Sequence, residues 1–281
     1  MMEYLERIIR IMYIRLCNLH RFMKIYFLGA TITWLFCTQG ISAQRQDANQ
    51  LFLEAKYTEA ATLIQQQIKK ARKQNQPTTT LDAALQRARM GENMALHADT
   101  VVYSDTIMIE RAQLFSALKL PKDAGTLLPA SQLLPEYAAH LGNSAYINGW
   151  GDVAYFSMAD SSGLHNLYRS LKINNKWTSP QLLPGLQTAD KDRDFPFMST
   201  DGTTLYFAEQ GTTSLGGFDL FITRYDFDTH TFLKPEQLRI PYNSPYNDLL
   251  YIKDKDGRIQ LVTDRNQPAD KLQILILTKN K

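Results

Sequence analysis

Ser199-Thr200-Asp201-Gly202-Thr203-Thr204-Leu205-Tyr206-Phe207-Ala208 is the stretch that decides the predicted fold, because the chain holds three copies of its pattern. An Asp-Gly turn precedes a short run of β-branched and aromatic residues, which is typical of a β-hairpin. The other copies are Asn148-Gly149-Trp150-Gly151 before residues 153–157 and Asp254-Lys255-Asp256-Gly257 before residues 259–263. The turn glycines lie at positions 151, 202 and 257, so the period is just over fifty residues.

A later strand follows each copy, at residues 166–169, 219–222 and 273–276. Short strands at regular spacing with turn signals between them predict a sandwich or a propeller, and four strands in each repeat favour the propeller. We therefore expect a mainly β fold with an N-terminal α-helical segment. Residues 143–281 are expected to form a partial or small β-propeller of about three recognisable blade repeats.

The repeats resemble a known family. Residues 199–207 are similar to the S-P-D-G-x-x-I-x-F signature of TolB-type, WD40-like (PD40-like) propeller repeats. Two further strings, residues 194–221 and 241–248, resemble repeats of Gram-negative envelope proteins that join tetratricopeptide helices to a propeller. Some of those relatives are linked to gliding or type IX secretion machinery. The resemblance implies an exported envelope protein. It does not imply peptidoglycan anchoring, because no OmpA-like segment is recognisable.

The leader, residues 1–43, has the parts of a secretory signal peptide. Basic Arg21 and Lys24 precede an apolar run over residues 25–37, and small residues follow up to Ala43. The run is shorter than the roughly 20 apolar residues that span a bilayer. We expect cleavage after Ala43, no stable membrane span afterwards, and a location in the periplasm or at the outer membrane.

Two details of the leader stay open. Met23 is an alternative start, because residues 1–22 exceed what a signal peptide needs before its apolar run. Lipid attachment at Cys37 is a rival to cleavage, but Phe36 stands where a lipoprotein signal has a small residue.

Charge and cysteine content exclude several classes of protein. Residues 1–43 hold five of the 31 basic side chains and two of the 28 acidic ones, which leaves 26 of each sign in residues 44–281. A neutral chain has no electrostatic footprint for phosphate backbones, so we expect no nucleic acid partner. Both cysteines, Cys17 and Cys37, lie in the leader, so the remainder has no disulfide, thiol nucleophile or cysteine zinc ligand.

Residues 44–98 have helical periodicity and are expected to form a tetratricopeptide-like hairpin. Pro77 separates two helices. Ala55-Lys56-Tyr57-Thr58-Glu59-Ala60 resembles the G-x-Y-x-x-A turn of that repeat, with Ala in place of Gly. One repeat does not bury its own apolar face. The hairpin is therefore expected to pack on the following domain, and a small peptide-docking surface is the alternative.

Residues 99–142 are expected to form a connector with one strand, from Val101 to Ile109, and a short helix over residues 110–118. Pro121, Gly125, Pro129 and Pro135 punctuate the rest. A soft domain boundary is placed near residue 100.

Asn143, Asp194 and Asp248 occupy equivalent positions, eight or nine residues before the three turn glycines. In a propeller such positions lie near the start of the innermost strand, close to the axis. There the three side chains either bind a polar ligand or satisfy backbone N–H groups between neighbouring blades. Arg193 fits either role. Trp150, which stands where the family signature has Asp, completes the candidate binding residues at a blade edge.

No metal or cofactor is expected. Asp190, Asp192 and Asp194 form a D-x-D-x-D run, but Phe195 stands where a calcium-binding EF-hand loop needs Gly, and basic residues interleave the carboxylates. The five histidines are far apart in the sequence, and none has the spacing or the acidic partner of a metal site.

These patterns favour an exported, non-catalytic interaction or scaffold module of the cell envelope. It would bind an envelope protein or a glycan, possess no enzymatic activity, and occur as a monomer or as a homo- or hetero-oligomer. The alternative is a propeller-type glycoside hydrolase that uses Asp194 and Asp248 as its pair of carboxylates. Carboxylates about 5–10 Å apart in an open pocket favour the enzyme, and carboxylates tied to neighbouring blades favour the module.

The last apolar strand, residues 272–277, is an aggregation hazard unless it is paired. Closed propellers have four to eight blades, so three repeats leave edges and faces to cover. Two remedies lie within the chain: the strand from Val101 to Ile109 completes the last blade, or Leu51, Tyr57, Ile64 and Ile68 of the helices cover an open face. We nevertheless predict that the chain is either a shortened relative of a longer propeller protein or pairs through this edge with another chain.

Overall fold

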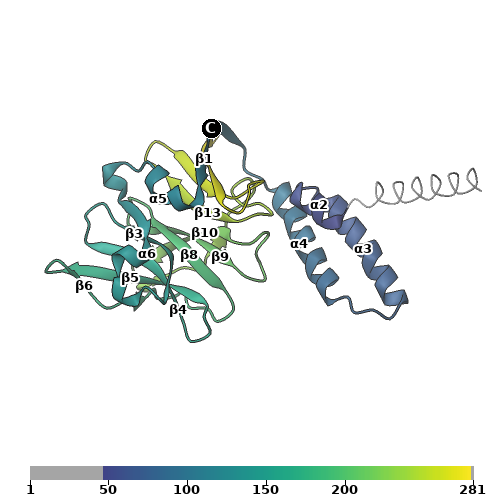
Figure 1. Ribbon diagram of the computed structural model, residues 1–281, viewed down its shortest axis with the longest axis horizontal. Helices are drawn as coiled ribbons and strands as arrows, with labels where there is room; N and C mark the ends of the chain where they lie inside the picture. Colours follow the sequence, from purple (N-terminus) through teal and green to yellow (C-terminus); the bar gives the residue numbers. More distant parts are fainter. Residues whose placement is uncertain (1–46, 280–281) are drawn as a thin grey trace, which may run out of the picture. The chain divides into compact units, whose positions relative to one another are not determined.

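The computed structural model describes residues 47–279 (Figure 1). The predictions for the signal peptide, its cleavage site and Cys37 lie outside the described residues. The chain divides into two compact units, Met1–Gln50 and Leu51–Lys281. Only residues 47–50 of the first unit are described, and every strand of the described chain belongs to the second.

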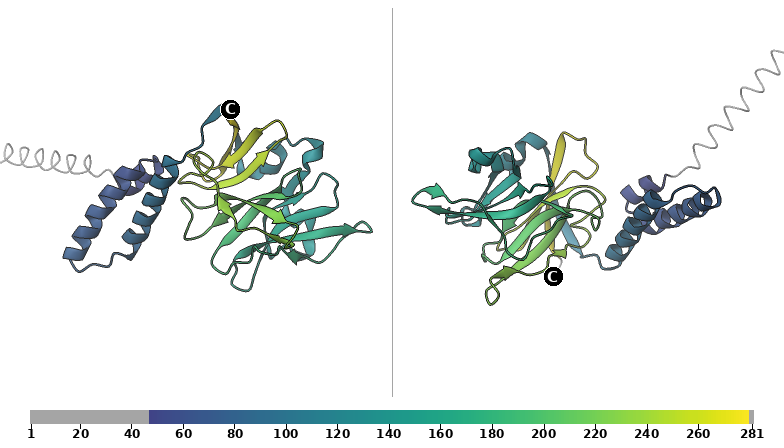
Figure 2. Two further views of the ribbon diagram at one scale, coloured as in Figure 1. Left: turned by 180° about the vertical axis from the view of Figure 1, so that it is seen from behind. Right: turned by 90° about the horizontal axis from the view of Figure 1, so that it is seen from below.

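Five α-helices and three 3-10 helices lie in the described part of the chain. They are α2 (Ala48–Leu53), α3 (Tyr57–Lys73), α4 (Thr79–Leu96), η1 (Arg111–Gln113), α5 (Leu114–Ala117), η2 (Lys122–Ala124), α6 (Ala130–Leu133) and η3 (Pro135–Tyr137). The long pair α3 and α4 forms an antiparallel hairpin, whose helices lie side by side in Figures 1 and 2.

Fifteen strands follow one another from residue 101 to residue 279. They are β1 (Val101–Glu110), β2 (Thr126–Pro129), β3 (Leu141–Ile147), β4 (Val153–Ala159), β5 (His165–Ile173), β6 (Lys176–Trp177), β7 (Gln181–Leu182), β8 (Asp192–Met198), β9 (Thr204–Gln210), β10 (Asp219–Asp226), β11 (Thr231–Phe232), β12 (Glu236–Gln237), β13 (Asp248–Lys253), β14 (Arg258–Thr263) and β15 (Lys271–Lys279). The described chain is thus mainly β, as predicted.

The strands form three antiparallel sheets, one for each repeat of the sequence. The first has the order β2-β3-β4-β5-β6, the second β11-β10-β9-β8 and the third β1-β15-β14-β13, with β7 and β12 added on β5 and β10. The turn glycines have positive φ angles, +76° at Gly151, +68° at Gly202 and +84° at Gly257, which a residue with a Cβ adopts only with strain. The Asp-Gly turns predicted from the sequence are therefore present in the last two repeats.

β1 pairs with β15 along its whole length, from Val101 opposite Lys279 to Glu110 opposite Lys271. The strand that precedes the repeats therefore completes the last sheet, which is one of the two remedies available within the chain. On its other edge β15 pairs with β14. The prediction that residues 272–277 need a second chain to cover an open edge is wrong, because β1 and β14 cover both edges internally.

Each sheet packs on the next through its first repeat strand. β8 of the second sheet contacts β3, β4 and β5 of the first, and β13 of the third sheet contacts β8, β9 and β10. Aromatic rings mark both junctions. Tyr146 packs edge-on against Phe197 with ring centroids 5.0 Å apart, and the rings of Tyr206 and Tyr251 have centroids 4.7 Å apart. The three sheets consequently share one hydrophobic core.

The connector between β1 and β3 covers apolar faces of the sheets. α5 contacts both β1 of the third sheet and β2 of the first, and Leu114 is buried in the shared core. α6 packs on β2 and β3, where Ala130, Leu133 and Leu134 join Phe156 in a second cluster. The connector contains two strands and several short helices, where one strand and one helix were predicted.

The helices α3 and α4 contact each other, and α3 buries one apolar stripe. Tyr57, Ala60, Ala61, Ile64, Ile68 and Ala71 are the buried residues of α3. Ile64 and Ile68 belong to neither core cluster of the sheets, so they do not cover a sheet face as the second remedy requires. Gly91 makes the helix contact possible, because a Cβ at this position would lie 2.5 Å from Cδ1 of Tyr57.

Candidate functional site

The three equivalent positions lie at or near the start of the first repeat strand of each sheet. Asn143 is in β3, Asp194 in β8 and Asp248 in β13. The strand pairing shifts register just after Asp194, just after Asp248 and around Asn143. Such irregularities redirect side chains from the regular ladder. Asp194 and Asp248 are buried, whereas Asn143 stays at the surface.

Asp194 connects the second sheet to the first. Its Oδ2 accepts hydrogen bonds of 2.7 Å from both the backbone N and Nδ2 of Asn143, and its Oδ1 accepts one of 2.7 Å from Oγ of Ser157. The backbone N of Phe195 also donates to Oδ1 at 2.7 Å. Asp194 is 2% exposed, and these donors occupy both of its carboxylate oxygens. The structure therefore brings Asn143 and Asp194 together, and their hydrogen bonds form a tie between the first and second sheets.

Asp248 forms a separate cluster in the third sheet. Nη2 of Arg265 donates to its Oδ1 at 2.7 Å and Nε at 2.9 Å, while Oγ of Ser244 donates to its Oδ2 at 2.9 Å. The side chain of Asp248 is fully buried. Burial raises the pKa of Asp248, and the guanidinium of Arg265 acts in the opposite direction. Asp248 is thus held by a charged partner, whereas Asp194 is held by neutral donors.

Asp219 is a second buried carboxyl group near Asp248, and the sequence pattern did not single it out. It accepts hydrogen bonds from the backbone N of Leu215 and from Nε2 of Gln237, at 2.5 and 2.6 Å. Burial is the main cause that raises the pKa of Asp219 to about 7, and the negative charge of Asp248 contributes to the rise. The only sequence signal was its place at the start of a predicted strand, which says nothing about a pKa.

The side chains of Arg193 and Trp150 form no hydrogen bond or ion pair with these carboxylates. Nε of Arg193 donates to Oε2 of Glu209 at 2.7 Å, and the guanidinium packs over the ring of Phe207. Lys191 donates to the other oxygen of Glu209. The basic residues that interleave the D-x-D-x-D carboxylates, Lys191 and Arg193, thus pair with Glu209. Trp150 is 90% exposed at the tip of the β3–β4 hairpin and joins none of these clusters.

The three carboxylates of the D-x-D-x-D run take different partners. Asp190 accepts a hydrogen bond from Thr188, and Oδ1 of Asp192 lies 2.8 Å from Nδ1 of His165. His165 therefore has an acidic partner that its position in the sequence did not reveal, because the two residues lie in adjacent sheets and 27 positions apart. Within residues 47–279 no group of three or more potential metal-ligating side chains occurs.

Asparagines fix the loop between β12 and β13 against the second sheet. Oδ1 of Asn243 accepts a 2.7 Å hydrogen bond from the backbone N of Leu220, and its Nδ2 donates to the carbonyl of the same residue. Oδ1 of Asn247 accepts a 3.0 Å hydrogen bond from the backbone N of Phe218. Both asparagines belong to the string at residues 241–248, so the string that carried the resemblance has a structural role.

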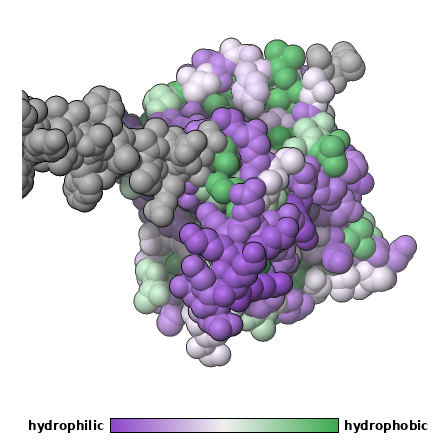
Figure 3. Space-filling model, turned by 90° about the vertical axis from the view of Figure 1, so that its right-hand side faces the viewer, coloured by the Kyte–Doolittle hydropathy of each residue, from purple (hydrophilic) through white to green (hydrophobic). Residues whose placement is uncertain are grey.

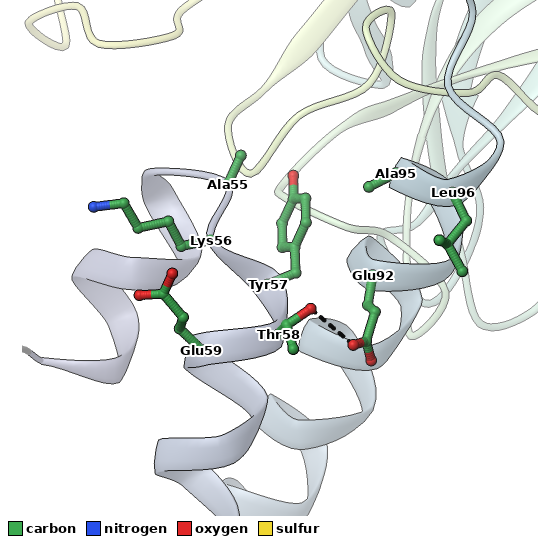
Figure 4. Close-up of a pocket in the computed structure, with 8 residues that line it drawn as sticks. All are labelled: Ala55, Lys56, Tyr57, Thr58, Glu59, Glu92, Ala95 and Leu96. Carbon is green, nitrogen blue, oxygen red and sulfur yellow. Dashed lines mark hydrogen bonds between the residues drawn. The ribbon is translucent and has the colours of Figure 1, made fainter.

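Two clefts open beside Tyr57. The first, called here the hairpin cleft, has a volume of about 400 Å³ and lies between the start of α3 and the end of α4 (Figure 4). Oγ1 of Thr58 donates a 2.8 Å hydrogen bond to Glu92 across it. Leu96, 78% exposed, provides an apolar wall, and Lys56 and Glu59 add charges.

The second cleft, called here the loop cleft, has a volume of about 440 Å³. It lies between the start of α3 and the loops at residues 240–246 and 265–266, and Tyr57 lines it as well. Figure 4 shows the Tyr57 ring between Ala55 and Ala95, with its hydroxyl directed away from the Thr58–Glu92 hydrogen bond. Asp194 and Asp248 line neither cleft.

The outer surface is polar on the side drawn in Figure 3. This face is mostly hydrophilic, and its apolar residues form small separate patches.

Within residues 47–279 no helix combines the length and the apolar character that crossing a membrane requires.

Comparison with known proteins identifies no relative. No protein-family model matches the chain, and none of the curated proteins matches it significantly.

Proposed function

We propose that the chain is an exported, non-catalytic interaction module of the cell envelope, built from a helical hairpin and a small propeller-like array of TolB type. Three consecutive sheets with equivalent turns support the array. The pairing of β1 with β15 also supports it, because propellers are often closed by a strand from the other end of the repeat region. The leader and the family resemblance favour the periplasm or the outer membrane.

The state of Asp194 is the observation that carries the non-catalytic assignment. A glycosidase needs one carboxyl group free to reach the leaving oxygen and another beside the sugar. Both oxygens of Asp194 accept short hydrogen bonds from the neighbouring sheet, and Asp248 is fully buried against Arg265. A sugar would have to displace these partners, at the cost of leaving buried donors unpaired.

The clefts beside Tyr57 are the surfaces to which we assign partner binding, and a protein is the partner that they favour. Both combine apolar walls with a few polar groups, as binding sites commonly do. The hairpin cleft also presents the exposed Leu96 beside the carboxylate of Glu92.

Photocrosslinking in cells tests this proposal. A photoreactive phenylalanine analogue at Leu96 is expected to capture one specific envelope protein, reproducibly identified by mass spectrometry. The matched control is the same analogue at Phe227, which is 65% exposed but lies outside both clefts. Equal capture at both positions contradicts the assignment of the clefts.

A screen of glycan substrates tests the alternative. We expect no hydrolysis by the wild-type chain. Reproducible hydrolysis that Asp194→Asn abolishes, while Asp190→Asn preserves it, would overturn the non-catalytic assignment, provided that circular dichroism shows both variants folded.

A further inference from the structure

The loop cleft is lined by apolar side chains and a buried aromatic ring. Leu53, Pro241 and Pro245 supply aliphatic surface, and Tyr57, only 4% exposed, also lines the cleft. Its volume of about 440 Å³ is within the range of about 300–1,000 Å³ typical of binding sites, so it accommodates a short stretch of polypeptide.

Tyr57 and Arg265 each have a side-chain donor in this cleft that has no acceptor within residues 47–279. The hydroxyl of Tyr57 makes no hydrogen bond there, although the residue is buried. Burial raises the pKa of Tyr57 to about 12, so the hydroxyl keeps its proton at neutral pH. Arg265 uses Nε and Nη2 for Asp248 and for the carbonyl of Tyr242, which leaves its Nη1 without an acceptor in the same residues.

The side-chain acceptors that line the cleft are, in contrast, already used. Oδ1 of Asn266 accepts a 2.6 Å hydrogen bond from the hydroxyl of Tyr246. Oδ1 of Asn243 accepts a hydrogen bond from the backbone N of Leu220, and Oγ of Ser244 accepts one of 3.3 Å from the backbone N of Tyr246. The cleft therefore offers donors and apolar surface to a ligand, and few acceptors.

Charge distinguishes a neutral ligand from an anionic one. Arg265 is the cation of the cleft, and Asp248 neutralises it through contacts of 2.7 and 2.9 Å. Glu54 also lines the cleft, and it pairs with Lys56 at 2.7 Å. Among the described residues that line the cleft, no uncompensated positive charge remains to attract a carboxylate or a phosphate. A neutral carbonyl oxygen is the acceptor that fits best.

We propose that the loop cleft binds an extended, proline-containing segment of a partner polypeptide, with one of its backbone carbonyls accepting hydrogen bonds from Tyr57 and Arg265. Proline suits a cleft of this kind because it has a carbonyl, no N–H group and an apolar ring. A proline-rich segment is also preformed as an extended helix, which lowers the entropy lost on binding. This inference deepens the proposed function and rests on its premise that the chain binds a polypeptide.

Fluorescence anisotropy with the purified full chain tests the inference. The probe is fluorescein-labelled acetyl-decaproline amide, and a labelled glycine-serine decapeptide is the control. We expect saturable binding of decaproline and at least tenfold weaker binding of the glycine-serine peptide. Equal affinity for both peptides, or no binding of decaproline at millimolar concentration, overturns the inference.

Tyr57→Phe removes the hydroxyl and keeps the ring, so the helical packing should survive. We expect the dissociation constant for decaproline to rise about three- to tenfold, as the loss of one hydrogen bond predicts. Tyr103→Phe, on exposed β1, is the matched control and should bind as the wild type does. An unchanged dissociation constant in Tyr57→Phe contradicts the assigned contact.

Gly91→Ala provides a second route to the same contact, because its methyl group would displace the Tyr57 ring. Binding that survives this change undiminished, in a variant shown to be folded, also overturns the inference.

A labelled decapeptide of glutamate that binds more tightly than decaproline would show that the cleft selects anions and would overturn it too. Failure of the photocrosslinking at Leu96 tests the hairpin cleft and the proposed function, and is thus distinguishable from these results.

Discussion

Asp194 and Asp248 occupy equivalent positions in successive repeats, yet the two sheets stabilise them differently. Asp194 accepts hydrogen bonds from neutral groups of the preceding sheet, chiefly Asn143 and Ser157. Asp248 pairs with the guanidinium of Arg265, in the loop that follows its own hairpin. The repeat therefore determines where a carboxylate is buried, whereas residues outside the repeat pattern determine which group balances its charge.

The largest effect is expected from Asp248→Asn. The substitution leaves the guanidinium of Arg265, whose side chain is 13% exposed, without its counter-charge. Breaking a buried ion pair from one side typically costs about 3–5 kcal/mol. Urea unfolding followed by circular dichroism should show a loss of this size in the free energy of unfolding. A loss below about 1 kcal/mol would show that Arg265 finds compensation elsewhere.

A smaller loss, about 2–3 kcal/mol, is expected from Asp194→Asn, because its new NH₂ group would face donors such as Nδ2 of Asn143 or Oγ of Ser157. At least one charge-assisted hydrogen bond is lost and a donor remains unpaired. No buried cation is left behind, which is why the cost is lower than at Asp248. The same urea unfolding experiment measures this loss. A loss equal to or above that of Asp248→Asn would show that the unpaired guanidinium of Arg265 is not the larger cost.

The pH dependence of stability separates the two regions further. Asp219, near Asp248, has a pKa of about 7 in the folded chain and an ordinary value near 3.8 when exposed. The folded state therefore binds more protons than the unfolded state between these values. Stability from this group is fully present below about pH 4 and is lost as pH rises to about 7, by at most about 1.4 kcal/mol per pH unit.

Asp219→Asn is the variant that isolates this effect. Subtracting its free energies of unfolding from those of the wild type, measured from about pH 4 to about pH 8, should give a difference that falls with pH and flattens above about 7. A flat difference over the whole range would show that Asp219 is ionised in the folded chain.

The smallest effect is expected from Ser157→Ala, which removes one donor from Asp194 and leaves the others in place. Because the carboxylate keeps its remaining partners, the free energy of unfolding should fall by about 1 kcal/mol. Ser162→Ala, which removes a hydroxyl donor to Asp160 at an exposed turn, serves as the control and should cost less. Equal costs would indicate that the tie between sheets contributes no more than a surface hydrogen bond.

The parts of the fold that depend on local pattern could be predicted from the sequence. The turns at Gly202 and Gly257, the β strands after them and the helices on either side of Pro77 are consequences of residue type and spacing. Ala55 is instructive, because it has a φ of +58° at the position where the resembled turn has Gly. The departure noted in the sequence thus coincides with a backbone conformation that favours glycine.

Contacts between distant segments were not predictable in the same way. His165 meets Asp192 across two sheets, and Arg265 meets Asp248 through a loop that is not part of the repeated motif. Spacing along the chain reports which face a side chain occupies, but not which neighbour it finds there. For the clefts, the sequence offered the turn motif at residues 55–60 and also Gly91, since a glycine inside a helix usually has a packing reason.

The pairing of β1 with β15 also determines when the third sheet can form. Ser104 of β1 donates a hydrogen bond to the carbonyl of Ile276, 172 positions later in the chain. During synthesis, β1 emerges long before its partner and must wait unpaired until the nine residues of β15 are made. Contacts between such distant segments slow folding. Completion of the third sheet is therefore coupled to the arrival of β15, and a chain cut short before residue 271 would leave β1 without its partner and one edge of β14 open.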